Sequence, residues 1–135
     1  MKTKNFDELR VGKVDSLMQE FTAKEVEAFN NLVGDVNPIH ADRDFAGKTA
    51  FGRRAVFGVL LVAHIHSRYS RNLKRSFKLI RHDVKFIKPV FLGEKIVFKL
   101  ECRQGRNNSL SCSSKAETKS GDAVLEESSE IKLMD

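Results

Sequence analysis

The first regular pattern of apolar and polar positions along the chain lies in residues 23–33 and predicts an α-helix. Its apolar residues recur at intervals of three and four, which places them on one face of a helix; they are Val26, Phe29 and Val33. Thr22, with Glu25 three residues later, forms the capping-box pattern of a helix start. Gly34 follows as a typical C-terminal stop.

A second pattern, in residues 55–66, is apolar almost all round. A helix without a polar face is expected to be buried at the centre of its own domain. Gly58 lies inside this segment and weakens a helix by about 1 kcal/mol relative to alanine. We therefore expect a neighbouring side chain or a ligand to approach the backbone closely at Gly58.

From about residue 77 the period of the pattern changes to two, which predicts strands with one buried face. The alternating apolar or small positions are Val84 and Phe86, then Ile96, Phe98, Leu100 and Cys102, then Leu110, Cys112 and Ser114. Residues 104–108 and 120–123 are turn candidates because of their glycine and asparagine, and a last strand is predicted over 123–133. The chain is therefore expected to form a single domain over 1–135 with an α+β fold, a mainly antiparallel sheet wrapped around one buried helix.

Composition restricts the class of protein. The 135 residues are 41% hydrophobic and 31% charged, as in an ordinary globular domain. No apolar run is long enough to span a bilayer, and the first ten residues lack the apolar core of a signal peptide. We therefore predict a cytoplasmic protein that is not inserted in a membrane. In that compartment the only cysteines, Cys102 and Cys112, are expected to be free thiols, since their spacing fits neither a zinc site nor a disulfide scaffold.

The net charge of +6 is concentrated in residues 68–85, called here the basic segment. Its cations are Arg68, Arg71, Lys74, Arg75, Lys78, Arg81 and Lys85, against the single acid Asp83. Such a segment is either a solvated surface or an attractor of anions, namely a phosphate-bearing cofactor, an acidic protein or nucleic acid. Nucleic acid is the least favoured of the three, because Tyr69 and Phe77 are the only aromatic residues available for stacking.

Candidate chemistry is densest in L-V-G-D-V-N-P-I-H-A-D, residues 32–42. Pro38 fixes its own backbone and disfavours a helical Asn37, so a stiff loop is predicted between Asp35 and His40. A short helical turn is expected to resume after Asp42, which is a suitable cap.

Several segments of the chain resemble a known family. The segment G-D-V-N-P-I-H-A-D-R-D-F-A (34–46) is similar to the hydratase motif of the MaoC-like (R)-specific enoyl-CoA hydratases and dehydratases, which have the hot-dog fold. Three supporting segments follow the family's order: F-D-E-L-R-V-G (6–12), F-G-R-R-A-V-F-G-V-L (51–60) and F-I-K-P-V-F-L-G-E (86–94).

The resemblance implies a reaction and its residues. Family members add water reversibly to trans-2-enoyl thioesters, and their catalytic pair corresponds to Asp35 and His40. A carboxylate and an imidazole that hold one water between them can move both protons of the reaction. The family's backbone N–H donor for the thioester oxygen corresponds to Gly58, at the start of the central helix. Asn37 is expected to orient the loop or Asp35.

The chain also departs from the family pattern. Phe57 stands where the family usually has histidine, and His66 stands where it often has serine, with Ser67 next. Because one residue turns a helix by about 100°, either His66 or Ser67 could reach the substrate, and we predict both as substrate-binding residues together with Asn37, Arg54 and Lys88. His64 and His66 do not share a helix face and form a poor metal pair, so no metal is predicted.

The resemblance further implies an acyl-CoA or acyl carrier protein thioester as substrate, no separate cofactor, and a homodimer or larger homo-oligomer. Two alternatives remain open at this point. One is a hot-dog thioesterase, since fold does not fix function. The other is a non-catalytic module that binds acyl-CoA or nucleic acid.

Overall fold

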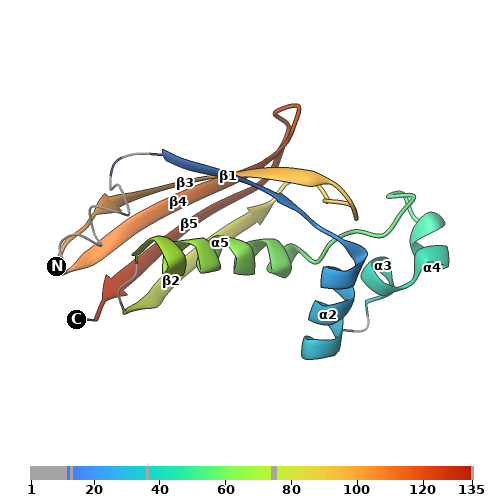
Figure 1. Ribbon diagram of the computed structural model, residues 1–135, viewed down its shortest axis with the longest axis horizontal. Helices are drawn as coiled ribbons and strands as arrows, with labels where there is room; N and C mark the ends of the chain where they lie inside the picture. Colours follow the sequence, from blue (N-terminus) through green and yellow to red (C-terminus); the bar gives the residue numbers. More distant parts are fainter. Residues whose placement is uncertain (1–11, 13, 36, 74–75, 135) are drawn as a thin grey trace.

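A computed structural model describes residues 12, 14–35, 37–73 and 76–134. One antiparallel sheet packs against the long helix α5, Gly58–Leu73 (Figure 1). The sheet has five strands in the order β1-β3-β4-β5-β2. The strands are β1 (Val14–Glu20), β2 (Phe77–Phe86), β3 (Lys95–Gln104), β4 (Ser109–Thr118) and β5 (Ala123–Leu133). The predicted α+β architecture is confirmed, including the last strand over 123–133 and both turns.

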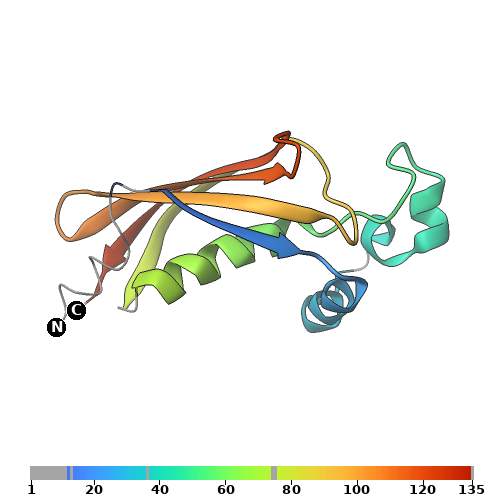
Figure 2. The same ribbon diagram turned by 45° about the horizontal axis from the view of Figure 1, so that its top comes forward.

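Alternation along the strands creates the core. In β3 the buried residues are Ile96, Phe98, Leu100 and Cys102, and exposed or half-exposed residues separate them. These side chains face Leu61, Ile65, Tyr69 and Leu73 of α5, which are also buried. Figure 2 shows α5 lying along the sheet, which covers one side of the helix.

The central helix differs from its prediction in position and in environment. It begins at Gly58 and ends at Leu73, because Val56 instead donates its backbone N–H to Val90 O at 2.7 Å and Ala55 forms a β-bridge with Phe91. The helix is also not buried all round. Val59 remains 58% exposed, since in this chain the sheet covers only one side of α5.

Helix α2, Ala23–Val33, has the predicted boundaries. The Thr22 side chain accepts a hydrogen bond from the Glu25 N–H at 3.2 Å. At the other end Gly34 has φ of 71° and donates its N–H to Asn30 O at 2.7 Å. The left-handed backbone conformation at this position favours glycine, because a Cβ is sterically unfavourable there. The helix therefore ends where the hydratase motif begins.

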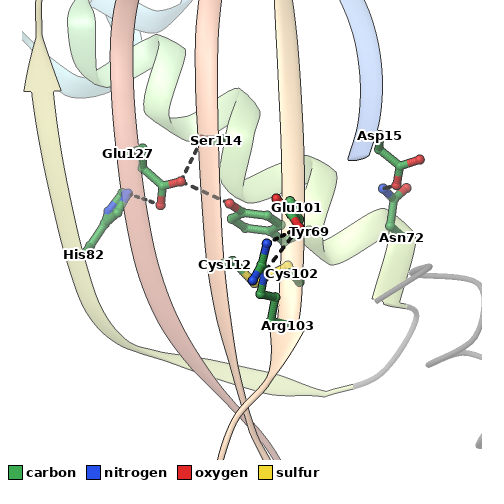
Figure 3. Close-up of a disulfide and its surroundings, with 10 residues drawn as sticks. All are labelled: Asp15, Tyr69, Asn72, His82, Glu101, Cys102, Arg103, Cys112, Ser114 and Glu127. Carbon is green, nitrogen blue, oxygen red and sulfur yellow. Dashed lines mark hydrogen bonds and ion pairs between the residues drawn. A yellow bond between two sulfur atoms is a disulfide. The ribbon is translucent and has the colours of Figure 1, made fainter. Parts of the chain in front are cut away.

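The expectation of free thiols is wrong in this structure. Cys102 and Cys112 form a disulfide, and their Cα atoms are 4.0 Å apart (Figure 3). The register of β3 and β4 places the two residues directly opposite each other, and directly opposed residues in antiparallel strands have Cα atoms close enough for a disulfide. The prediction of free thiols was based on the cellular compartment and on the sequence spacing, and neither gives the register of the two strands.

A buried polar cluster lies beside the disulfide, between the sheet and α5 (Figure 3). Glu127 is 4% exposed and accepts hydrogen bonds from Tyr69 Oη at 3.0 Å and Ser114 Oγ at 2.7 Å. His82 Nε2 lies 3.0 Å from the other carboxylate oxygen. Burial, and secondarily the Glu127 carboxylate, raises the pKa of Tyr69 well above its usual value. The sequence pattern did not indicate this buried hydrogen-bonded cluster.

Two of the sequence features fall partly outside this description. Residues 6–11 of the segment F-D-E-L-R-V-G, and Lys74 and Arg75 of the basic segment, lie outside the described residues. Among the described helices, none has the length and apolar character needed to cross a membrane.

Candidate active site

The hydratase motif forms the connection between α2 and α5. It contains two short helices, α3 (Pro38–Ala41) and α4 (Arg43–Gly47), at one end of the sheet (Figure 1). The Asp42 side chain accepts from the Phe45 N–H at 3.0 Å, as its predicted capping role requires. The connection is thus organised by short-range hydrogen bonds, which are encoded locally.

Side-chain caps make the loop before α3 stiff. Asp35 Oδ1 accepts from the Asn37 N–H at 2.8 Å, which is an Asx turn. Asn37 Oδ1 in turn accepts from the Ile39 N–H at 3.2 Å and caps α3. Pro38 occupies the first helical position, where its missing N–H costs nothing. The two side-chain caps organise the described part of this loop, and Asn37 acts on it as expected.

His40 is held on several sides. Its Nδ1 lies 2.7 Å from the Ala55 carbonyl oxygen. A carbonyl can only accept, so Nδ1 carries the hydrogen and Nε2 is left as the basic nitrogen of the neutral imidazole. The ring packs on Phe57 with centroids 4.1 Å apart, and Arg54 Nε donates to the His40 carbonyl at 3.0 Å. The tautomer and position of His40 are therefore set by its neighbours.

Asp35, His40, Gly58 and Lys88 line one cavity of 580 Å³. The rest of its wall is almost entirely apolar, formed by Phe51, Ala55, Val56, Phe57, Val59, Leu61, Phe86, Ile87, Pro89 and Val90. An apolar cavity with a few convergent polar groups is the usual form of a small-molecule site. The structure thus brings the three predicted catalytic residues together with one predicted substrate-binding residue.

Gly58 is the first residue of α5. The N–H groups of Leu60 and Leu61 donate to Phe57 O at 3.0 and 3.4 Å, while the Gly58 N–H has no hydrogen-bond acceptor among the described residues. An unpaired N–H at a helix start suits an anionic oxygen. A Cβ on Gly58 would lie only 2.6 Å from Phe86 Cε1, so the expected close approach is confirmed and comes from the Phe86 ring.

The other predicted substrate-binding residues lie outside this cavity. Arg54 supports His40 and reaches 4.0 Å from Glu27. His66 is exposed and packs on Phe77, with ring centroids 5.5 Å apart. Ser67 lines a separate groove between β1 and α5. Their role in substrate binding stays a prediction that the cavity itself does not support.

Sequence reasoning missed the apolar wall that surrounds the predicted catalytic pair in the cavity. Phe86 and Val59 are 53% and 58% exposed, although both are large apolar residues. Exposed apolar residues gathered around a cavity indicate a binding surface, but their sequence positions, on a helix and at a strand end, give no sign that they meet. Within the described residues, no group of three or more His, Cys, Asp or Glu side chains is arranged to hold a metal ion.

The fold and this cavity together define a class of protein. The chain matches the solved structure of the (R)-hydratase from A. caviae involved in PHA biosynthesis with a TM-score of 0.83 and 28% identity, over 92% of this chain and 96% of that one. The sheet wrapped around a central helix is therefore the hot-dog fold, as the resemblance implied.

Sequence comparisons then identify the family. The model of the MaoC-like domain matches residues 11–124. The chain is 35% identical over 94 residues to an (R)-specific enoyl-CoA hydratase of Aeromonas caviae, which covers 69% of this chain and 70% of the relative. It is 31% identical over 97 residues to a 3-hydroxybutyryl-CoA dehydratase of Methylorubrum extorquens, over 71% of this chain and 62% of the relative. The chain belongs to the MaoC-like domain family.

Proposed function

We propose that the chain is a hydro-lyase that adds water to trans-2-enoyl thioesters, or removes it from (R)-3-hydroxyacyl thioesters. The observation that carries this proposal is the meeting of Asp35, His40 and Gly58 in one apolar cavity. The curated relatives at 35% and 31% identity act in the same reaction class, as their names state.

The catalytic pair supplies the proton transfers. His40 Nε2 and the Asp35 carboxylate hold one water between them. Its oxygen bonds to the β-carbon of the substrate, and a proton passes to the α-carbon, so that water adds across the double bond with no atom left over. Since adding water causes no net oxidation or reduction of the substrate, the reaction needs no redox cofactor. The fixed loop geometry keeps both groups positioned, which lowers the entropic part of the barrier.

The backbone N–H of Gly58 supplies the electrostatic stabilisation of the transition state. Negative charge develops on the thioester oxygen when the β-carbon is attacked. The unpaired Gly58 N–H, at the positive end of α5, donates to that oxygen. A hydrogen-bond donor already fixed in position costs no reorganisation during the reaction, which explains why a backbone group performs this task.

The remaining wall binds the two ends of the substrate. The apolar side chains of the cavity accommodate the acyl chain. Lys88 is exposed at the cavity and lies 3.8 Å from Asp122; it attracts the phosphates of coenzyme A or of a carrier-protein arm. Both carriers are compatible with one lysine, so both belong in the assay.

We also propose that the active form is a homodimer or larger homo-oligomer. Strand β2 lies at a sheet edge, and its Leu79, Ile80 and Phe86 are 41%, 48% and 53% exposed. An edge strand of ten residues with three exposed apolar side chains is a ready site for pairing with another copy. Size-exclusion chromatography with light scattering tests this, and a monomer that is fully active would contradict it.

The deciding experiment follows loss of the enoyl-thioester absorbance with crotonyl-CoA, a longer enoyl-CoA and a crotonyl carrier protein. Asp35→Asn and His40→Ala are each expected to reduce kcat/KM by about 100-fold or more. Asp44→Asn, in the exposed first turn of α4, is the matched control and should retain activity. Wild-type activity that survives in both cavity variants would refute the proposal. Release of free thiol instead of hydration would identify a thioesterase.

A further inference from the structure

A second hollow lies on the outer face of the sheet, away from α5. Its volume is 710 Å³, and it is lined mainly by outward-facing residues of β2, β4 and β5 together with the β3–β4 turn, with the buried Ser109 and Ser129 also contributing. Alternation fixes this orientation along β5, because Ser128, Glu130 and Lys132 are exposed at the hollow while Ile131 and Leu133 are buried toward the helix. The hollow is called the outer groove below.

Four cations line the outer groove: Lys78 and Arg81 from β2, Arg106 from the turn, and Lys132 from β5. The acids at its wall are Asp83 and Glu130, so four positive charges face two negative ones. The basic segment of the sequence thus contributes two of the four cations. The groove has an excess of positive charge that no part of the proposed active site uses.

The pairing of these cations is unusual. The register of β2 and β5 places Lys78 directly opposite Lys132. Like charges in directly opposed positions of a sheet destabilise it. Within the part of the chain that the structure describes, Lys78, Lys132 and Arg106 form no ion pair, while Arg81 donates to Asp83 at 3.3 Å. An anion between the two lysines would turn a repulsion into two attractions.

The groove favours a particular kind of anion. The hydroxyl-bearing Ser111 and Ser128 line it between the cations, and its one large apolar residue is Ile80. Without an aromatic face, it offers nothing on which a nucleobase could stack. Arginine and lysine on different sides of a hollow with hydroxyl groups suit the several oxygens of phosphate groups.

We propose that the outer groove binds a small phosphate-rich anion, with Lys78, Lys132 and Arg106 as its principal contacts. This site is separate from the thioester cavity. The cavity includes Phe86 at the last position of β2, whereas Lys78 is the second residue of the same strand. Eight residues of extended strand separate them by roughly 25 Å, and the groove lies on the opposite face of the sheet. The ligand is therefore distinct from a substrate bound in the same protomer's cavity.

Titration calorimetry at low and at physiological ionic strength tests the proposal, with sodium tripolyphosphate and adenosine 3′,5′-bisphosphate as probes. Both carry phosphates, and comparing them distinguishes an inorganic polyphosphate from the nucleotide part of coenzyme A. Binding by at least one probe is expected, and Lys78→Ser with Lys132→Ser should weaken it at least tenfold. The same substitutions should leave the hydratase rate with crotonyl-CoA unchanged.

Lys115→Ser is the matched control, because Lys115 faces outward on β4 but does not line the outer groove. If Lys115→Ser weakens binding as much as Lys78→Ser or Lys132→Ser alone does, the attraction comes from the general positive charge of the surface, and the proposal is refuted. Binding by neither probe also refutes it. Equal binding of a poly-glutamate peptide, with the same dependence on the lysines, would overturn the phosphate assignment in favour of an acidic protein.

Lys132→Glu separates lost binding from lost folding. This variant replaces a repulsion with Lys78 by an attraction, so its thermal midpoint without ligand should equal or exceed that of the wild type. We expect it to show no increase in midpoint with tripolyphosphate, whereas the wild type does. A variant that is as stable as the wild type and still responds fully would contradict the assignment of Lys132.

Discussion

Gly58→Ala tests the close contact between the start of α5 and the Phe86 ring. An added Cβ would lie 2.6 Å from Phe86 Cε1, whereas ordinary contacts begin near 3.4 Å, so the ring must move by about 0.8 Å. Phe86 is half-exposed and can shift at little cost. In a helix, alanine is also favoured over glycine by up to about 1 kcal/mol. We therefore expect the free energy of unfolding to change by less than about 1 kcal/mol.

Activity should respond much more strongly than stability. In the proposed reaction the thioester oxygen binds the Gly58 N–H, and the methyl group and the displaced ring both lie beside that N–H. A misplacement near 1 Å can cost about 100-fold in rate, so kcat/KM with crotonyl-CoA should fall by roughly 10- to 100-fold. Initial rates and urea denaturation of the same preparation give both quantities.

A partner substitution, Phe86→Leu, separates the two causes. Leucine is shorter than phenylalanine and leaves room for the new methyl group. The double variant should recover only the part of the loss that came from the displaced ring. Unchanged kcat/KM in Gly58→Ala would refute the argument that substrate approaches this backbone. Complete recovery in the double variant would show that the methyl group itself obstructs nothing.

Three further outcomes follow from the structure. Tyr69 is the only tyrosine, and its pKa is raised by burial and by its carboxylate neighbour, so tyrosinate absorbance should be absent from the folded protein at pH 11. An unfolded tyrosine ionises near pH 10 while the folded one stays neutral, so the free energy of unfolding should fall above pH 10 by up to about 1.4 kcal/mol per pH unit. Tyr69→Phe should lack this part of the pH dependence. Ionisation of Tyr69 near pH 10 in the folded protein would contradict the prediction. Reduction of the Cys102–Cys112 disulfide opens a short loop and should cost about 2–3 kcal/mol in urea denaturation, and equal stability with and without reductant would argue against the bond. His66→Ala and Ser67→Ala should change kcat/KM less than threefold, since neither residue lines the cavity; a large loss in either would restore its predicted contact with the substrate.

The features that sequence predicted well are those set by short-range rules. The capping pattern of Thr22 and Gly34 gave the boundaries of α2, because caps depend on residues three or four positions apart. The loop that carries Asp35 and His40 follows the same rule, since side-chain caps from Asp35 and Asn37 organise it, whereas the catalytic role of the pair came from the family resemblance and stays a prediction. Hydrogen bonds between residues a few positions apart can be inferred from a sequence, because both partners lie in one short segment.

Features that depend on strand register or helix phase could not be predicted. Strand β1 contains V-D-S-L-M-Q-E, in which apolar residues do not alternate, and it forms because β3 offers a partner. The Cys102–Cys112 pair exists only because two strands meet in one register. His66 comes directly after the buried Ile65, and a turn of about 100° per residue places it on the exposed side of α5.

The ring that closes over Gly58 belongs to an edge strand and not to the core. Phe86 is the last residue of β2 and more than half of its side chain remains accessible. A core residue in the same role could not be exchanged without repacking several neighbours. Phe86 can therefore be exchanged with less repacking than a core residue, which makes it the natural position at which to alter the space around the Gly58 N–H.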